Sequence, residues 1–484
     1  MKRLLIYLKA YKKECILAPL FKMLEASFEL LVPLVMVAII DIGIGNQNKT
    51  YILKMCIILI VLGTIGLVCS IVAQFFAAKA AVGFSATLRH SLFAHLQKLS
   101  FTEIDILGTS TMITRMTSDI NQVQTGVNMV LRLFLRSPFI VVGAMIMAFT
   151  IDVKIALYFV IAIVLLSVVV FGIMLTSIPM LKKVQQKLDH IVSITRENLT
   201  GVRVIRAFCK EEEEIEKFVN RNKALTKSQK RAGSISALMN PVTYIIVNIV
   251  ITRLIWTGSI QVEKGILTQG QVIALYNYMA QILVELIKLA NLIITINKAV
   301  ASGNRIADVF EIKNSMFIKN EMPEMPRPEH ADAVTFQNVS LKYKNGGEDT
   351  LTDIDLQVKK GETIGIIGGT GSGKSSLVSL ISRFYDATKG NVLINGINVK
   401  DYPASLLQEC VGVVMQKAAL FKGTIEENIR WGKKDASKAE LLAAIKTAQA
   451  EDVIESKGGL KGEITQGGSN LSGGQRQRMT IARA

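Results

Sequence analysis

Long apolar runs dominate the first 300 residues of the chain. A helix of about 20 residues crosses the hydrocarbon core of a bilayer, and the apolar runs have roughly this length. The fourth run is the clearest, because no charged residue occurs from Ile155 to Met180. The pattern predicts a domain of six transmembrane helices, over Ile16–Ile40, Tyr51–Phe76, Leu133–Thr150, Ile155–Ile178, Pro241–Ile260 and Val272–Ile296.

The links between the six runs alternate in length. Three links are short, and two are long, over Ala77–Arg132 and Met180–Asn240. Both long links mix apolar and polar residues at helical spacing and lack an interior proline, so we expect the transmembrane helices to continue beyond the membrane. Each long link has a candidate turn at its far end, at Phe101–Gly108 and Leu199–Phe208.

Basic residues are concentrated in the two long links. The positive-inside rule therefore predicts that these links and both termini are cytoplasmic. The same rule explains the net charge of +17 better than nucleic-acid binding does. The N-terminal run is interrupted by Lys9, Lys12 and Lys13, which favours an amphipathic helix on the cytoplasmic membrane face over a cleaved signal peptide. The five cysteines and four histidines show no metal-ligand spacing.

Several charges fall inside the predicted transmembrane helices. A charge within the membrane is expected to face a cavity or a charged partner, and it then marks a functional site. The alternative is pairing within the same helix or extension of the side chain to the interface. Both interpretations stay open for Glu25, Glu29 and Glu285, and the alternative is favoured for Arg132 and Arg136. Further charges in these runs are Lys22, Arg253 and Lys288.

The composition changes after residue 310. Residues 311–332 are polar and carry Pro323, Pro326 and Pro328, which predicts a linker between domains at 1–310 and 333–484. Alternating residues predict strands at Val334–Val339 and Ile354–Val358, and Asn395-Gly396 predicts the turn of a hairpin within Gly390–Val399. Further apolar runs predict buried strands at Thr363–Ile367 and Val411–Met415, and Ser437–Ala450 is predicted to be helical.

A glycine-rich stretch between a predicted strand and a predicted helix fits the pattern G-x-x-x-x-G-K-[ST]. Its glycines allow successive backbone N–H groups to point inward at an anion, and the following helix directs its positive dipole end to the same place. Lys374 is expected to neutralise the β- and γ-phosphates of a nucleoside triphosphate, and the Ser375 hydroxyl to bind Mg²⁺. The predicted phosphate loop comprises Gly368, Gly369, Thr370, Gly371, Ser372, Gly373, Lys374, Ser375 and Ser376.

A second small-residue loop precedes the helical residues Met479–Ala484. It reads Leu471, Ser472, Gly473, Gly474 and Gln475 and lies about a hundred residues after the phosphate loop. The two loops in this order, behind six apolar runs, resemble the ATP-binding cassette (ABC) family. The resemblance is to an exporter half-transporter, and it covers nearly the whole chain. It implies an all-α transmembrane domain followed by an α/β P-loop NTPase domain.

The resemblance also assigns roles to individual residues. It implies that Tyr343 stacks on adenine, and that Gln416 contacts Mg²⁺ and the attacking water. It implies that Leu471–Gln475 is the signature loop, which completes the ATP site of a partner subunit. The two candidate turns resemble the helices that couple the domains of the family. Before the signature loop, Gln466 stands where the family often has a glutamate. The sequence with glutamine is similar to that of bacterial exporters that form heterodimers, so a heterodimer is slightly favoured over a homodimer.

In the family, a strand with a Mg²⁺-binding aspartate and a catalytic glutamate follows the signature, and then a histidine. This sequence has none of them before it ends at Ala484, and we expect it to be incomplete. The favoured hypothesis is an ATPase-coupled exporter subunit that moves hydrophobic drugs or lipids across the cell membrane. One alternative is a regulatory subunit with a non-hydrolysing site. Another, a nucleic-acid translocase, is opposed by the six apolar runs.

Overall fold

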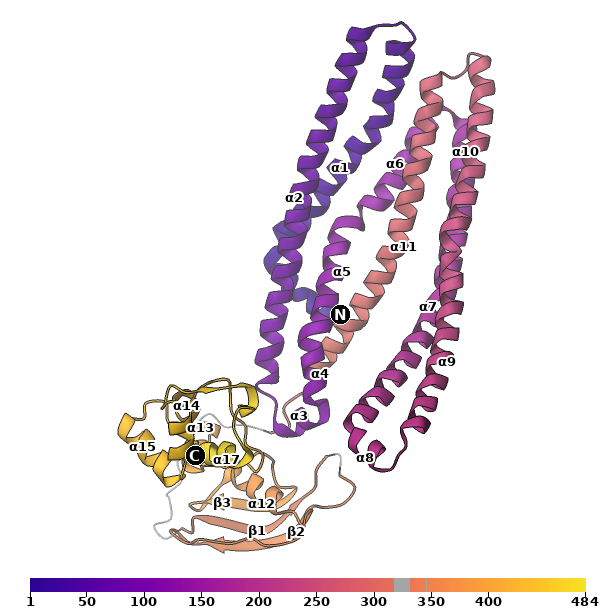
Figure 1. Ribbon diagram of the computed structural model, residues 1–484. Helices are drawn as coiled ribbons and strands as arrows, with labels where there is room; N and C mark the ends of the chain where they lie inside the picture. Colours follow the sequence, from indigo (N-terminus) through magenta and orange to yellow (C-terminus); the bar gives the residue numbers. More distant parts are fainter. Residues whose placement is uncertain (317–330, 345) are drawn as a thin grey trace. The chain divides into compact units, whose positions relative to one another are not determined.

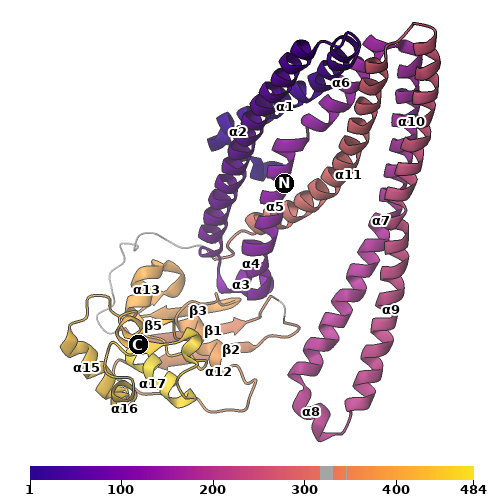
Figure 2. The same ribbon diagram turned by 45° about the horizontal axis from the view of Figure 1, so that its top comes forward.

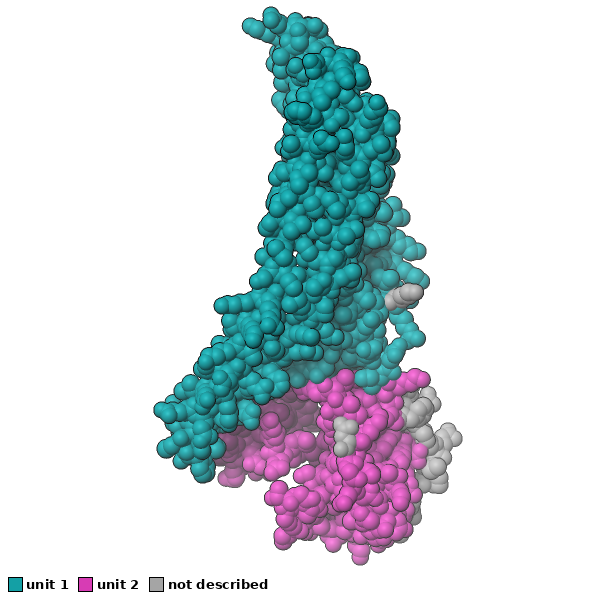
Figure 3. All heavy atoms as spheres, turned by 90° about the vertical axis from the view of Figure 1, so that its right-hand side faces the viewer, with its two compact units in different colours: residues 1–97, 110–312 teal, residues 98–109, 313–484 magenta. Residues whose placement is uncertain are grey.

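The computed structural model describes residues 1–316, 331–344 and 346–484, and it divides into two compact units (Figures 1 and 3). Unit 1 comprises residues 1–97 and 110–312, and unit 2 comprises residues 98–109 and 313–484. Most of the linker predicted at 311–332 lies outside the described residues. The turn predicted at Phe101–Gly108 belongs to unit 2, together with the C-terminal half of the chain.

All regular secondary structure in unit 1 is helical among the described residues. Six of its helical stretches are long and apolar enough to cross a membrane, as predicted: Arg3–Ile44, Lys49–Leu96, Thr109–Ile151, Val153–Thr200, Glu211–Glu263 and Gln269–Glu311. The elements are the 3₁₀-helix η1 (Lys2–Tyr11), α1 (Lys12–Ala38), the π-helix η2 (Ile39–Ile44), α2 (Lys49–Leu96), α4 (Thr109–Thr114), the π-helix η3 (Arg115–Asp119), α5 (Ile120–Leu133), α6 (Arg136–Ile151), α7 (Val153–Thr200), α8 (Val202–Ala207), α9 (Glu211–Ala237), α10 (Met239–Glu263) and α11 (Gln269–Glu311).

The helices continue well beyond the apolar runs. Helices α2 and α7 have 48 residues each, which at 1.5 Å per residue is about 72 Å, against roughly 30 Å for the hydrocarbon core. The predicted turns are the short turn helices α3 (Phe101–Leu107) and α8. Helices α7 and α9 lie side by side as they approach and leave α8 (Figure 2). The prediction that both long links are helical is confirmed.

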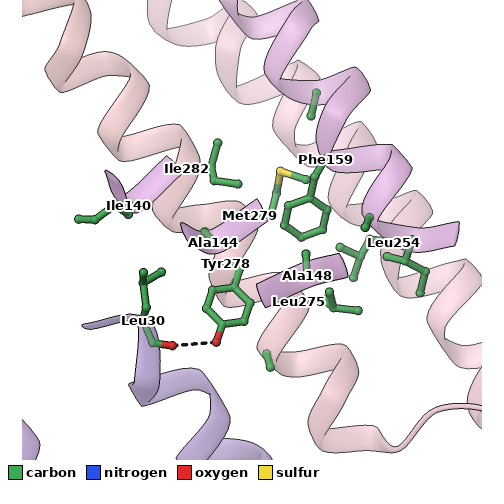
Figure 4. Close-up of a cluster of buried hydrophobic side chains, with 14 of the residues drawn as sticks. Leu30, Ile140, Ala144, Ala148, Phe159, Leu254, Leu275, Tyr278, Met279 and Ile282 are labelled. Atoms are coloured by element: carbon green, nitrogen blue, oxygen red, sulfur yellow. Dashed lines mark hydrogen bonds between the residues drawn. The ribbon is translucent and has the colours of Figure 1, made fainter. Parts of the chain in front are cut away.

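A buried apolar cluster joins five helices of unit 1. Leu30 of α1, Phe159 of α7, Leu254 of α10 and Tyr278 of α11 pack there with small residues of α6 (Figure 4). Tyr278 is fully buried, and its hydroxyl donates a hydrogen bond to the carbonyl oxygen of Leu30 at 2.8 Å. Because a buried polar group is costly without a partner, this bond allows a tyrosine in an apolar cluster and ties α11 to α1.

The first half of unit 2 is built on an antiparallel sheet with strand order β2-β1-β3-β4. Its strands are β1 (Val334–Leu341), β2 (Leu351–Val358), β3 (Lys389–Ile394) and β4 (Ile397–Asn398). Asn395 and Gly396 both have positive φ, +50° and +79°, as a two-residue hairpin turn requires. The two N-terminal strands and the hairpin are confirmed. Helices α12 (Lys374–Ile381) and α13 (Ala404–Cys410) and the 3₁₀-helix η4 (Val399–Asp401) complete this part.

Two strand predictions are wrong. Thr363–Ile367 and Val411–Met415 have no regular structure, and the side chain of Ile367 is 98% exposed. An extended segment becomes a strand only when a neighbouring strand supplies hydrogen bonds. Among the described residues, no strand pairs with either run. Both runs are apolar, as a buried strand requires, but an apolar composition does not supply a neighbouring strand.

The second half of unit 2 is mainly helical and has its own buried cluster, which includes Leu420, Ile425, Ile445 and Met479. The helix predicted at Ser437–Ala450 is present as α15, with Ser437 as its N-cap. The elements are β5 (Gly423–Thr424), α14 (Ile425–Ile429), α15 (Lys438–Thr447), α16 (Glu451–Ser456), β6 (Glu463–Ile464), the 3₁₀-helix η5 (Gln466–Gly468) and α17 (Gly473–Arg483); β5 pairs with β6.

Phe336→Ala should destabilise unit 2. Phe336 lies in β1, is 1% exposed and packs in the cluster that supports α12. Removal of such a ring costs about 3–5 kcal/mol, because the cavity that remains does not collapse fully. Thermal unfolding of the purified protein measures the loss, and Gln337→Ala, at the exposed neighbouring position, is the control. Equal melting temperatures for the two variants would contradict this assignment of the core.

Candidate functional site

The phosphate loop has a backbone that requires glycine at two positions. Gly371 and Gly373 have φ of +86° and +83°, a region that other residues adopt only with strain. A Cβ on Gly373 would also lie 2.7 Å from a methyl carbon of Leu351 and 3.0 Å from the carbonyl oxygen of Thr350. The strand β2 therefore packs directly against the loop, and the positive φ values are compatible with the anion nest that the sequence predicts.

Helix α12 begins at Lys374, so the last three residues of the phosphate loop form its first turn. The ammonium of Lys374 donates hydrogen bonds to the carbonyl oxygens of Gly368 and Gly369, at 2.8 and 2.6 Å. Its charge therefore lies over the loop, near the positive end of the α12 dipole. Ser375 is exposed at the start of the helix, and Ser376 is buried. These are the groups that the sequence predicts to bind a phosphate chain, and they lie together at the start of α12.

The structure brings Tyr343 to the phosphate loop. Its hydroxyl donates a hydrogen bond to Oγ of Ser376 at 2.9 Å, and its side chain is half-buried just after the end of β1. The sequence suggested this tyrosine only through the family resemblance. The contact with Ser376 places its ring beside the residues expected to hold the phosphates, which is where an adenine-stacking ring is needed.

Two residues near Tyr343, namely Tyr385 and Asp105, were not predicted from the sequence. The ring of Tyr385 lies edge-on to Tyr343, with centroids 5.0 Å apart, and its hydroxyl donates a hydrogen bond to Asp105 of α3 at 2.6 Å. Burial and this hydrogen bond raise the pKa of Tyr385, so its phenol stays protonated and donates. Asp105 and Tyr385 are 280 residues apart in sequence, and neither belongs to a recognisable motif.

A cavity of about 360 Å³ lies beside these residues, within unit 2. Strand β1 and its following loop supply Leu341 and Tyr343, and the segment after α12 supplies Tyr385. Helix α3 supplies Thr102 and Asp105 from the other side. The tyrosine expected to stack on adenine therefore faces a space large enough for part of a nucleotide, and α3 forms one of its walls.

The signature loop is a well-formed helix start. Ser472 caps α17, because its hydroxyl accepts a hydrogen bond from the backbone N–H of Gln475. In return, the side-chain oxygen of Gln475 accepts a hydrogen bond from the backbone N–H of Ser472. Leu471 is 5% exposed and anchors the loop in the C-terminal cluster. Gly473 and Gly474 are exposed, and a Cβ on either would meet nothing within 4 Å. The loop thus presents free backbone at a helix N-terminus.

Gln416 is exposed in a bend, and no hydrogen bond joins it to the phosphate loop among the described residues. No hydrogen bond joins the signature loop to the phosphate loop among the described residues either. The structure therefore joins Tyr343 to the phosphate loop by a hydrogen bond, and it shows no such bond from Gln416 or the signature loop among the described residues. In the described ranges, no group of three or more His, Cys, Asp or Glu side chains is arranged to hold a metal ion.

Unit 1 contains a buried ion-pair network around Arg136 of α6. The guanidinium donates to both carboxylate oxygens of Glu29 in α1, at 2.9 and 2.7 Å, and to Glu285 in α11 at 2.7 Å. Ser137 and Lys288 also donate to Glu285. The prediction that Arg136 pairs within its own helix or extends to the interface is wrong. A bidentate guanidinium can bridge two carboxylates, so the charge is neutralised by neighbouring helices.

Glu25 and Glu29 line a cavity of about 330 Å³ between α1 and α2. Glu25 is also paired with Lys22 of the same helix at 2.5 Å, and Lys22 donates to Ser70 of α2 at 3.0 Å. Both interpretations from the sequence therefore apply to Glu25, which faces a cavity and has an intrahelical partner. The carboxylate of Glu29 faces the same cavity while it is bound to Arg136.

Comparison with known families places both halves of the chain. The family description "ABC transporter transmembrane region" matches residues 15–286, and "ABC transporter" matches residues 351–484. A solved structure, of a bacterial Atm1-family ABC exporter with ATP bound, superposes with a TM-score of 0.76 over 98% of this chain and 83% of that chain. Its sequence identity is 21%, so this likeness concerns the fold.

Curated relatives match 82–100% of this chain. The uncharacterized ABC transporter ATP-binding protein YfiB of Bacillus subtilis is 32% identical over 485 residues, which are 100% of this chain and 84% of that protein. The putative multidrug export ATP-binding/permease protein YgaD of Bacillus subtilis is 32% identical over 508 residues, with the same coverage. An ATP-dependent lipid A-core flippase of Syntrophus aciditrophicus is 29% identical over 404 residues, 82% of this chain and 66% of that protein.

Gly373→Ala should abolish binding of ATP analogues, because alanine strains the backbone at positive φ and collides with Leu351. Gly369→Ala is the matched control, since a Cβ there meets nothing within 4 Å. Equilibrium binding of a fluorescent ATP analogue measures the difference. Equal affinity for the two variants would contradict the loop geometry.

Arg136→Met should destabilise the protein by about 3–5 kcal/mol, because it leaves two carboxylates without their shared partner. The triple variant Glu29→Gln/Arg136→Met/Glu285→Gln should recover most of the loss, since it removes all three charges together. Thermal unfolding in detergent gives both values. Arg253→Met, at an exposed position on α10, is the control, and a single variant as stable as this control would exclude a structural role for the network.

Proposed function

The chain belongs to the ABC transporter family, and we propose that it is a half-transporter subunit that pairs with a second subunit to export hydrophobic compounds. It is a multi-pass membrane protein with an ABC ATPase domain and takes part in ATP-coupled transport. The observation that carries the proposal is the phosphate loop, in which Lys374 lies over glycines of positive φ with Tyr343 beside them.

The separation of the two loops supports a site shared between subunits. We propose that the phosphate loop and the signature loop each bind an anion, and no hydrogen bond joins the two loops among the described residues of this chain. The exposed N–H groups at Gly473 and Gly474 are suited to the phosphates of an ATP molecule held by the partner's phosphate loop. A homodimer or a heterodimer satisfies this requirement, and the Gln466-Gly467-Gly468 sequence favours the heterodimer slightly.

Mg²⁺ is the expected companion of the triphosphate. The Ser375 hydroxyl is exposed at the start of α12, beside the loop, and suits a hard cation that prefers oxygen ligands. Gln416 would add a side-chain oxygen once it approaches the loop. The ion would neutralise charge on the phosphates, while Lys374 and the loop amides orient the chain and the Tyr343 ring receives the base.

The transported compound is proposed from the membrane half. Its spans are strongly apolar, and the charges of the Arg136 network are already paired, which favours hydrophobic drugs or lipids over ions and sugars. Relatives named for multidrug export and for lipid A-core flipping agree with this class. The basic long links support a cytoplasmic location for the nucleotide-binding unit and the N-terminus. The proposed direction of transport, outward, follows the relatives named for export and flipping.

In the proposed cycle, two subunits enclose two ATP molecules, each between one phosphate loop and the other subunit's signature loop. Closure moves the turn helices α3 and α8, which continue along the chain into the long membrane helices. The membrane domain then changes from inward-facing to outward-facing, and hydrolysis resets it. ATP acts because it binds the closed state better than the open state.

Lys374→Ala should abolish ATP-dependent transport by the full-length protein with its partner, because the triphosphate loses its main counter-charge. Uptake into inverted vesicles of a panel of hydrophobic cations, lipids and peptides measures this loss and identifies the substrate class. Lys360→Ala, at an exposed position in the same unit, is the control. Unchanged transport by Lys374→Ala would refute the ATP site.

A further inference from the structure

We propose that Tyr385 is a positioning residue of the nucleotide site, which holds the ring of Tyr343 in the orientation that receives adenine. Asp105 of the turn helix α3 in turn holds Tyr385. The part of the site that receives adenine would then be lined by α3, which comes from the N-terminal part of the sequence. This inference rests on the proposed ATP site and adds to it two residues that belong to none of its motifs.

The contacts form a continuous chain within unit 2. Asp105 accepts from the Tyr385 hydroxyl at 2.6 Å, and the Tyr385 ring meets the Tyr343 ring edge-on with centroids 5.0 Å apart. The Tyr343 hydroxyl reaches Ser376 at 2.9 Å, beside the Mg²⁺-binding candidate Ser375. Edge-on geometry is favourable for two aromatic rings, because the positive ring edge faces the negative ring face.

The ring of Tyr343 needs such support because it lies on a loop. Its backbone follows the last residue of β1, where the Lys342 amide donates to Thr388 at 2.9 Å. The backbone is thereby anchored, but the direction of the ring depends on side-chain contacts. The Ser376 hydrogen bond fixes one end of the ring, and Tyr385 fixes the tilt of its plane.

Helix α3 holds Tyr385 by more than one contact. Phe101 packs on Phe384, with ring centroids 4.8 Å apart, and lies 6.3 Å from the Tyr385 ring. The hydrogen bond from Tyr385 to Asp105 adds a directional restraint to this apolar contact. Because α3 lies between α2 and α4 along the chain, a displacement of these helices reaches the ring that receives the base.

Affinity for a ligand with a base should therefore depend on Tyr385, and affinity for a ligand without one should not. The test measures binding of Mg-ATP and of magnesium tripolyphosphate to the purified full-length protein by titration calorimetry. Tyr385→Ala should weaken ATP binding about 3- to 10-fold, the range that loss of one aromatic pair gives, and leave tripolyphosphate binding unchanged. In the assembled transporter, the KM for ATP should rise by the same factor while kcat stays the same.

Three further variants separate the hydroxyl from the ring. Tyr385→Phe and Asp105→Ala each remove the hydrogen bond and keep the ring, so both should weaken ATP binding by less than Tyr385→Ala. Asp105→Asn keeps an oxygen that accepts from the tyrosine and should restore ATP affinity. Tyr402→Phe is the matched control, because it removes another buried hydroxyl of the same unit, which donates to Ile394 at 2.9 Å.

The outcomes distinguish failure of this inference from failure of the ATP site. The positioning role is wrong if Tyr385→Ala weakens the binding of both ligands equally or of neither. It is also wrong if Tyr385→Ala changes the affinity for ATP no more than Tyr402→Phe does. Lys374→Ala should weaken both ligands, and if it changes neither, the ATP site itself is wrong. Thermal unfolding of each variant identifies a general loss of structure, and if Tyr385→Ala does not fold, Asp105→Ala against Asp105→Asn decides.

Discussion

Hydrocarbon offers no hydrogen-bond partner to the peptide backbone, and the membrane half of this protein follows from that constraint. Each crossing is a helix, because a helix satisfies its own N–H and C=O groups. The same requirement applies to charges, since Arg136 at the start of α6 has to be matched by Glu29 and Glu285 from other helices. The network thereby joins α1, α6 and α11, just as the Tyr278 hydroxyl joins α11 to α1. Polar satisfaction in an apolar environment determines which helices stay together.

The local features of the chain could be predicted from its sequence. The six apolar runs, the helical long links, the Asn395-Gly396 turn and the small-residue loop before α17 each depend on residues close together in the chain. The glycine positions of the phosphate loop belong to the same class, because positive φ is a property of single residues. For such features the residue types are themselves the physical cause.

The features that failed depend on distant partners. Thr363–Ile367 has the composition of a strand, but a strand exists only as one side of a ladder. Arg136 was expected to pair within its own helix or to extend to the interface, whereas its carboxylate partners lie 107 and 149 residues away in the sequence. Asp105 and Tyr385 show no pattern of their own, and only the folded unit brings them to Tyr343. A single sequence contains no record of such pairs unless a motif marks them.

The two parts of the proposed nucleotide site therefore depend on different parts of the structure. The phosphate part is local, because its glycines, Lys374 and the start of α12 are contiguous and keep their geometry wherever α3 lies. The base part is assembled from β1, the segment after α12 and α3, so its geometry follows a helix that is continuous with the membrane half. If α3 moves, the protein can retain the triphosphate while its hold on the base changes. A binding change of a few fold at each of two sites would multiply between subunits, which is enough to bias a transporter whose two states differ by little free energy.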